Sequence, residues 1–159
     1  MKRLFLLLFL IPIAGFSKNQ QLQYQPVLVN VKGYVKTLKF PGPPNYISIK
    51  DGDADETGGY LILNMPIDVI SSRNSNNVPE KNVKLIQLIV HNANDWKKLQ
   101  DYNQVQIEGT LLHALTGHHH ARVLIKIKKV TILSTATKPI QLDLTQEDQK
   151  FLQHEYLQE

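Results

Sequence analysis

Apolar and polar side chains alternate along much of this 159-residue chain, as they do in β-strands that have one face buried. The alternation is clearest in residues 104–111, where every second residue from Val105 to Leu111 is apolar or glycine and those between are polar. Similar segments are residues 27–38, 60–65, 83–90 and 122–132. Residues 83–90 carry apolar side chains on both faces, which favours a central strand. The pattern therefore predicts five strands.

A short helix is expected between the third and fourth of these strands. Residues 93–102 follow Asn92 and contain Asn94, and either asparagine can cap the N-terminus of a helix. Trp96 and Leu99 lie three positions apart, so on a helix they would face the same way. We expect this pair to close one end of the structure that the strands form.

This order of elements is the one expected of an OB-fold, a five-stranded Greek-key barrel. An isolated glycine in a strand marks a bulge or a sharp bend, and Gly33 would let one strand serve two parts of a closed barrel. A small β-sandwich built from the same strands is the alternative. We therefore predict a mostly all-β chain with an OB-fold-like barrel over residues 26–133. A C-terminal extension, residues 134–159, would hold a second short helix capped by Thr145.

The N-terminal segment has a different character. Residues 1–17 carry Lys2 and Arg3, then an apolar run, then small residues. This is the pattern of a secretory signal peptide, and its apolar run is well short of the ~20 residues that span a bilayer. An uncleaved anchor is the alternative. Cleavage after Ser17 would leave a flexible, glutamine-rich lead-in over residues 18–25 and no stable membrane insertion.

The amino-acid composition limits which cellular compartments and which binding partners are expected. The chain has no cysteine, which excludes disulfides and a lipid-modified N-terminal cysteine. It has 18 basic and 14 acidic residues, and two of the basic ones lie in the signal-like segment, so the remainder is close to neutral. A strong general attraction to nucleic acid is therefore not indicated. We expect a periplasmic or secreted bacterial protein.

Two loops are the most unusual stretches of the chain. In an OB-fold, the loops between strands 1 and 2 and between strands 4 and 5 flank the binding face. The first loop contains Phe40-Pro41-Gly42-Pro43-Pro44-Asn45-Tyr46, and the second contains three consecutive histidines, 118 to 120. The fold hypothesis thus brings the two stretches together. The predicted ligand-binding residues are Phe40, Tyr46, Asp53, His118 and His120.

The three histidines allow two interpretations. On an extended chain, His118 and His120 would share a face that His119 opposes. With Asp51 or Asp53 from the other loop, the pair offers ligand types suited to Zn²⁺, Cu²⁺ or Ni²⁺. His113, five residues before His118, is a further candidate across the same turn. The other interpretation is that the histidines bond the loop backbone and determine its shape, since a histidine tract is by itself a weak indication of metal binding. The candidate metal ligands are His118, His120 and His113, and no cofactor is identified.

The proline-rich loop would form a rigid apolar wall for a sugar, a peptide or a loop of another protein. The alternative is a stiff turn with Phe40 and Tyr46 packed beneath it. The acidic residues from Asp51 to Glu56 favour a solvated loop over a calcium site, because an EF-hand count from Asp51 places Ile62 at the twelfth position. The chain lacks a G-x-S-x-G motif and a cysteine nucleophile, which favours a binding module over an enzyme.

The two loop motifs resemble those of a family of small bacterial secreted domains known only as a domain of unknown function. The matches are FPGPPNY at residues 40–46 and TGHHH at residues 116–120, with shorter ones at Gly52-Asp53, Glu56 and residues 109–111. The resemblance covers roughly residues 27–130. This chain departs from the family pattern at Ile47 and Ala121, where glutamate and threonine are usual. The resemblance implies no particular activity.

Together these patterns predict an exported binding or interaction module of unknown ligand. Its site would lie between the FPGPPNY loop and the GHHH loop, and its partner would be a protein, a peptide or a glycan of the cell envelope. A transition-metal-binding protein that uses the histidines is the alternative. A small metal-dependent enzyme at the same site is a further one.

Overall fold

The computed structural model describes residues 18–71, 77–116, 118–136, 141 and 143–155. The predicted signal peptide, residues 1–17, lies outside them. Strands make up most of the described chain: β1 (Gln20–Gln23), β2 (Leu28–Pro41), β3 (Asp55–Ile70), β4 (Glu80–Ile89), β5 (Gln104–His113) and β6 (Val123–Ser134). The helices are short: the 3₁₀ turn η1 (Ile49–Asp51), α1 (Ala93–Trp96) and α2 (Gln146–Glu155). None of the described helices is long and apolar enough to cross a membrane.

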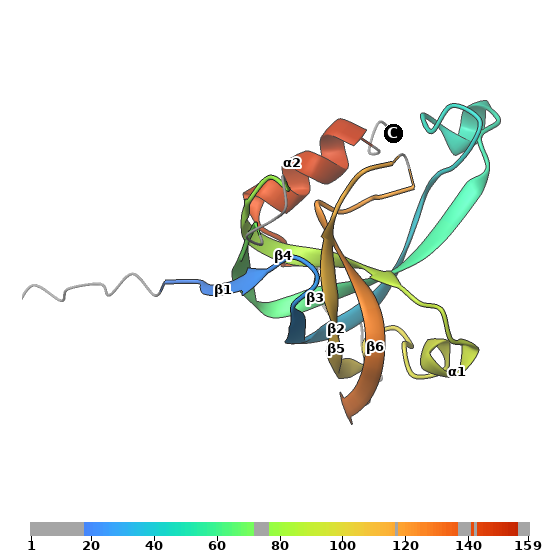
Figure 1. Ribbon diagram of the computed structural model, residues 1–159. Coiled ribbons are helices and arrows are strands. Elements are labelled where there is room, and N and C mark those ends of the chain that lie inside the picture. Colours follow the sequence, from blue (N-terminus) through green and yellow to red (C-terminus); the bar gives the residue numbers. More distant parts are fainter. Residues whose placement is uncertain (1–17, 72–76, 117, 137–140, 142, 156–159) are drawn as a thin grey trace, which may run out of the picture.

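Five of the strands close into a barrel (Figure 1). β2 pairs antiparallel with β3 and with β5, β3 pairs antiparallel with β4, and β5 pairs antiparallel with β6. A parallel pairing of β4 with β6 closes the ring. The helix α1 connects the third barrel strand, β4, to the fourth, β5. The prediction of an all-β, OB-fold-like barrel is therefore confirmed.

Gly33 is the point at which β2 changes its partner. The first part of β2 pairs with β5, the second part pairs with β3, and Gly33 is matched with both Val105 and Leu63. A Cβ atom on Gly33 would lie 2.2 Å from the carbonyl oxygen of Ile62, closer than any side chain tolerates. Glycine is thus required here because two backbones approach each other closely.

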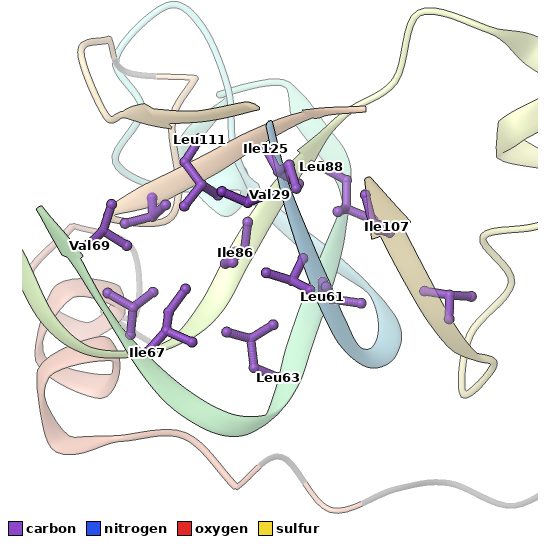
Figure 2. Packing of buried hydrophobic residues seen from close by; sticks show 14 of the residues in the cluster. Val29, Leu61, Leu63, Ile67, Val69, Ile86, Leu88, Ile107, Leu111 and Ile125 are labelled. Carbon is purple, nitrogen blue, oxygen red and sulfur yellow. The ribbon is translucent and has the colours of Figure 1, made fainter. Parts of the chain in front are cut away.

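The inward faces of the barrel strands form one hydrophobic core (Figure 2). On β5 the buried residues are Val105, Ile107, Gly109 and Leu111, which alternate with partly exposed polar neighbours as the sequence pattern predicts. Leu61 on β3 and Ile125 on β6 meet them from other sides of the barrel and are fully buried. Each such side chain contributes about 1.5–3 kcal/mol to folding through its removal from water.

Residues 18–25 were predicted to be a flexible lead-in, and for most of them this prediction is wrong. Residues 20–23 form β1, which pairs in parallel with residues 67–70 of β3. Asn19 donates hydrogen bonds to the side chains of Asp68 and Asn82, and Tyr24 is completely buried in the core. The glutamine-rich composition suggested flexibility, but this segment is ordered by contacts with residues 67–70, which are more than 40 positions away.

The helix predicted over residues 93–102 is also shorter than expected. Asn92 caps α1 by accepting a 2.8 Å hydrogen bond from the N–H of Asn94, but the helix ends at Trp96. Leu99 then turns into the core, whereas Trp96 remains 44% exposed. The two side chains therefore do not act as a pair, and only Leu99 fills the barrel interior as predicted.

The strand predicted over residues 60–65 extends from Asp55 to Ile70 and runs through Pro66. The register of β3 against β4 shifts between Ile62 and Ile67. A proline is tolerated in the interior of a strand at such an irregularity, where its missing N–H costs no ladder bond. The extension places Glu56 on a strand instead of in a loop.

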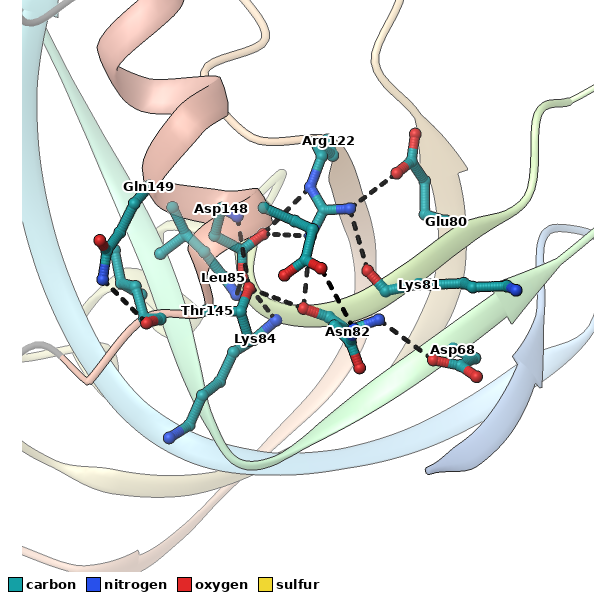
Figure 3. A network of polar contacts seen from close by, with 12 residues as sticks. Asp68, Glu80, Lys81, Asn82, Lys84, Leu85, Arg122, Thr145, Asp148 and Gln149 are labelled. Atoms are coloured by element: carbon teal, nitrogen blue, oxygen red, sulfur yellow. Dashed lines mark hydrogen bonds and ion pairs between the residues drawn. The ribbon is translucent and has the colours of Figure 1, made fainter. Parts of the chain in front are cut away.

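The C-terminal helix is an integral part of the domain (Figure 3). Thr145 caps α2 by accepting a hydrogen bond from the N–H of Asp148, as predicted. The carboxylate of Asp148 accepts hydrogen bonds from the backbone N–H groups of Lys84 and Leu85 on β4 and pairs with Arg122 at 2.7 Å. Leu152 of α2 joins a second buried cluster with Phe40, Tyr60, Ile62, Leu85 and Ala121.

Candidate functional site

The two loops predicted to converge do so at one end of the barrel. The Tyr46 hydroxyl, from the loop between β2 and β3, lies 2.9 Å from Nε2 of His118, from the loop between β5 and β6. Their rings meet edge to face with centroids 5.2 Å apart. Gly117, which precedes the histidines, lies outside the described residues.

Asp53 organises the first loop. Its carboxylate accepts hydrogen bonds from the backbone N–H groups of Asn45, Ile47 and Ser48, at 2.7 to 2.9 Å. These bonds hold the pKa of Asp53 below its usual value, and the bonds from Ile47 and Ser48 contribute most to the lowering. They flank Tyr46, whose φ of 59° is uncommon for a residue other than glycine. Asp53, a predicted ligand-binding residue, is buried, and its carboxylate shapes the loop that presents Tyr46. Ligand binding by Asp53 stays a prediction.

Glu56 joins the two predicted histidines. Its Oε1 atom lies 2.6 Å from Nδ1 of His118, and its Oε2 atom lies 3.2 Å from Nε2 of His120. Burial on its own would raise the pKa of Glu56, but the hydrogen bonds from the two imidazoles lower it overall. The carboxylate is therefore ionised at neutral pH and can only accept hydrogen bonds.

An ionised Glu56 determines where the imidazole protons lie. Each histidine must donate to it, so His118 carries a proton on Nδ1 and His120 carries one on Nε2. Burial lowers the pKa of His120, although the neighbouring carboxylate of Glu56 acts in the opposite direction. The lowered pKa favours the neutral ring. In neutral His118 the Nε2 atom is an acceptor, so the Tyr46 hydroxyl donates to it. Tyr46, His118, Glu56 and His120 thus form one hydrogen-bonded chain.

Phe40 and His120 support this chain from inside the protein. Their rings are stacked with centroids 4.3 Å apart and planes inclined by 10°. Phe40 is 3% exposed and His120 is 2% exposed. Both are predicted ligand-binding residues, and the structure places both beneath the surface. Tyr46 and His118 are the members of the predicted set that solvent reaches.

His119 and Gln87 determine the shape of the histidine loop. The Nδ1 atom of His119 accepts hydrogen bonds from the backbone N–H groups of Leu115 and Thr116, at 2.8 and 3.3 Å. Burial is the main cause that lowers the pKa of His119, and the neighbouring His118 adds to it. Gln87 on β4 accepts from the N–H of His120 and donates to the carbonyl of His118. The backbone-shaping interpretation therefore holds for His119.

A groove lies beside the chain of hydrogen bonds. The ladder between β3 and β4 begins at the pair Tyr60–Gln87, and no pairing of these strands continues beyond it toward Glu56. The space between them has a volume of about 360 Å³ and is lined by residues 56–60, residues 87–90, Trp96 and residues 118–120. A Cβ atom on Gly59 would lie 3.0 Å from the Trp96 ring, so glycine lets the indole approach the strand. We name this space the histidine groove.

His113, the third predicted metal ligand, has other hydrogen-bond partners than His118 and His120. Its Nδ1 atom lies 2.8 Å from the Ala114 carbonyl oxygen, and its Nε2 atom lies 3.3 Å from Glu80. Among the described residues, no group of three or more histidine, aspartate or glutamate side chains is arranged to hold a metal ion. The structure thus does not assemble the predicted ligand set of His118, His120 and His113, and metal binding by the first two stays a prediction.

Sequence reasoning missed three contributors to the site: Glu56, Gln87 and Trp96. Glu56 stands in an acidic run that indicates a solvated loop, and its role depends on histidines more than 60 positions away. Trp96 was expected at the closed end of the barrel. The signal that could have identified Glu56 is the need of adjacent histidines for a carboxylate partner.

A family model described as a domain of unknown function (DUF4431) matches residues 85–131. The matched residues include the second half of β4, α1, β5, the histidine loop and most of β6. The resemblance expected from the sequence is thus confirmed over this part of the chain, whereas the FPGPPNY motif at residues 40–46 lies outside the match. No curated protein and no solved structure matches the chain.

Proposed function

We propose that this chain is an exported binding module and that its ligand occupies the histidine groove. The observation that carries the proposal is the position of the groove, which lies between β3 and β4 on the face that OB-folds use for binding and is lined by the histidine loop. The FPGPPNY loop reaches this lining through the hydrogen bond between Tyr46 and His118. Its volume of about 360 Å³ lies within the roughly 300–1,000 Å³ that is typical of small-ligand sites.

The lining of the groove indicates what it would bind. Trp96, which is 44% exposed, offers part of its indole ring, and the partly exposed Gly58 offers backbone without a side chain. Glu56 and His118 offer a hydrogen-bond acceptor and an imidazole at one end. An aromatic face beside a few polar groups suits a sugar ring or a short piece of peptide. We therefore propose a polar, uncharged segment of a glycan or a peptide as the ligand.

The described part of the chain has other cavities that could bind a ligand. Two further cavities of about 280 and 300 Å³ lie near β1, and both are lined by Gln20, Met65 and Ile67. Neither has an imidazole or an aromatic ring in its lining. The chemistry of their walls is thus less suited to specific recognition, although their volumes are similar.

Mapping with small organic probes tests the proposal before a ligand is known. Tag-free protein is titrated with isopropanol, phenol and N-methylacetamide while amide chemical shifts are recorded by NMR. We expect the shifts to gather at residues 56–60, residues 87–90 and Trp96. The variant Trp96→Ala should weaken them, and the matched variant Met65→Ala should not. Shifts that gather around Met65 instead would contradict the assignment of the groove.

The export part of the proposal is supported by the signal-like pattern of residues 1–17. The full chain is expressed in a bacterium with a periplasm, and the protein of the periplasmic fraction is sequenced from its N-terminus. We expect Lys18 to be the first residue. A full-length chain that stays with the membrane fraction would contradict export as a cleaved protein.

A further inference from the structure

We propose that Tyr46, whose hydroxyl lies 2.9 Å from the groove-lining His118, is a nucleophile that cleaves small esters beside the histidine groove through an acyl-tyrosine intermediate. This inference rests on the proposed function, because the groove must first admit a ligand. It adds a reaction to that binding and assigns it to Tyr46, His118 and Glu56. Each of the three has a separate role, which the arrangement of their atoms determines.

The three side chains repeat the order of groups in hydrolases that use a hydroxyl nucleophile. A hydroxyl donates to one imidazole nitrogen, and a carboxylate accepts from the other. Here the Tyr46 hydroxyl lies 2.9 Å from Nε2 of His118, and Nδ1 of His118 lies 2.6 Å from Glu56. Such an arrangement is recognised by its geometry and not by the order of its residues in the sequence.

The environment of each group suits its role. Tyr46 is half-buried and the side chain of His118 is 55% exposed, so a substrate can reach the hydroxyl–imidazole pair. Glu56 is less exposed and is also held by His120, which fixes the carboxylate in place. The backbone around Tyr46 is held by the bonds of Asp53 to both neighbours of Tyr46. A nucleophile positioned in this way loses little entropy when it reacts.

The reaction proceeds in two balanced steps. In the first, the Tyr46 oxygen attacks the ester carbonyl carbon while His118 takes the phenolic proton on Nε2. The bond from the carbonyl carbon to the alcohol oxygen then breaks, and the imidazolium gives its proton to the leaving alcohol. In the second, His118 removes a proton from water, which attacks the acyl-tyrosine. The acid is released, and the phenolic oxygen recovers its proton from His118.

Glu56 acts in both steps through His118. It keeps the proton of the resting imidazole on Nδ1, so that Nε2 is free to accept, and it stabilises the imidazolium that forms. His120 and Phe40 are positioning residues, since His120 holds the second carboxylate oxygen and Phe40 stacks on His120. His120 also lines the groove and Phe40 does not, and neither contacts the ester in the proposed reaction.

The experiment uses two electrophiles on the full tag-free chain. Phenylmethylsulfonyl fluoride reports nucleophilicity directly, since attack by a tyrosine oxygen forms a sulfonate ester and releases fluoride. The modified residue is identified by peptide mass spectrometry. Hydrolysis of p-nitrophenyl acetate then reports turnover. Tyr34 on β2, which is half-buried like Tyr46, is the internal reference for an ordinary tyrosine.

We expect the sulfonyl group on Tyr46 at a rate at least about tenfold above that on Tyr34, because a positioned general base contributes roughly 10²–10⁴-fold. Tyr46→Phe should abolish both readouts at this site, and His118→Gln and Glu56→Gln should each lower the rate at Tyr46 at least about tenfold. Tyr34→Phe should leave hydrolysis of the acetate unchanged. Equal labelling of the two tyrosines would overturn the inference, as would a Glu56→Gln variant that folds and reacts at the wild-type rate.

The outcome is separable from that of the proposed binding function. Organic probes that gather in the histidine groove, together with unselective labelling of tyrosines, would leave a binding module and remove the ester-cleaving reaction. Selective labelling of Tyr46 together with probes that gather around Met65 would support the reactive tyrosine and move the ligand elsewhere. Thermal melting of each variant shows whether a lost reaction reflects a lost fold.

Discussion

Phe40 and His120 stack face to face, with ring centroids 4.3 Å apart and planes inclined by 10°. Phe40 is the first residue of the FPGPPNY motif, and His120 is the last of the three histidines. Their contact joins the two loops below the surface, and the hydrogen bond between Tyr46 and His118 joins them above it. The buried contact supports the exposed one, so the loops form a single unit.

Replacement of Phe40 tests the buried contact. Phe40→Ala removes a side chain that packs against both His120 and Tyr60, and we expect a loss of about 3–5 kcal/mol in the free energy of unfolding. Urea denaturation measures the loss. Ile47→Ala, in the same loop but 65% exposed, is the control and should change stability by less than about 0.5 kcal/mol. Equal effects of the two changes would show that the stack does not hold the loops together.

Asp53 should make stability depend on pH in acid. Its pKa in the folded protein lies below the ordinary 3.8, so the ionised carboxylate stabilises the fold above about pH 4. This stabilisation is lost as the pH falls through the lowered pKa, because the protonated form accepts fewer backbone hydrogen bonds. We expect Asp53→Asn to be less stable than the wild type at pH 7 and the difference to shrink toward pH 2. A difference in urea midpoint that is constant over this range would contradict the role of the charge.

His119 should affect stability at a higher pH. Its folded pKa is lowered from 6.5, so the folded state favours the neutral ring whose Nδ1 accepts two backbone hydrogen bonds. The stabilisation is complete above the unfolded value of 6.5 and is lost as the pH falls through the folded pKa. Asparagine offers an acceptor at a similar position and does not titrate. We expect the stability advantage of wild type over His119→Asn to decline from pH 7 to pH 5, and an advantage that grows instead would contradict this assignment.

The pair of Asp148 and Arg122 anchors α2 to the barrel. The side chain of Asp148 is 1% exposed and that of Arg122 is 10% exposed. Asp148→Ala would leave the guanidinium and the N–H groups of Lys84 and Leu85 without this acceptor, and we expect a loss of about 3–5 kcal/mol in the free energy of unfolding. Glu147→Gln, an exposed neighbour on the same helix, is the control and should be close to neutral. Similar midpoints for the two variants would mean that α2 is dispensable.

Metal content distinguishes the hydrogen-bonded chain from the metal-binding alternative. If protons join Glu56 to His118 and His120, tag-free protein should melt at the same temperature with and without EDTA. If a transition metal joins them instead, the protein should carry about one equivalent of Zn²⁺, Cu²⁺ or Ni²⁺. EDTA should then lower the melting temperature, because a ligand of the native state stabilises it. Elemental analysis and thermal melting decide between the two.

The features that were predictable from the sequence are those with local causes. The alternation in residues 104–111 reflects the two faces of one strand, and Asn92 and Thr145 cap helices through bonds to residues two or three positions away. Gly33 was identified because a barrel strand needs a bend. These signals lie within a few residues of the structure they determine.

The features that were missed depend on distant partners. Residues 20–23 form a strand because β3 offers an edge more than 40 positions away. Asp53 resembles a ligand residue in the sequence, but its carboxylate is used by backbone N–H groups that only the folded loop presents. Glu56 becomes part of the site because β3 begins earlier than its apolar pattern and carries the carboxylate to the histidines. Periodicity contains no information on such contacts.

The central claim is that Tyr46, His118, Glu56 and His120 form one hydrogen-bonded chain beside the histidine groove. The positions of the imidazole protons test this claim most directly. Long-range ¹H–¹⁵N NMR correlations on labelled, tag-free protein at neutral pH identify the tautomer of each ring. We predict a proton on Nδ1 of His118 and on Nε2 of His120, with the His118 signals changed in Tyr46→Phe and in Glu56→Gln. A proton on Nε2 of His118 with Nδ1 unprotonated, unaffected by either substitution, would contradict the chain.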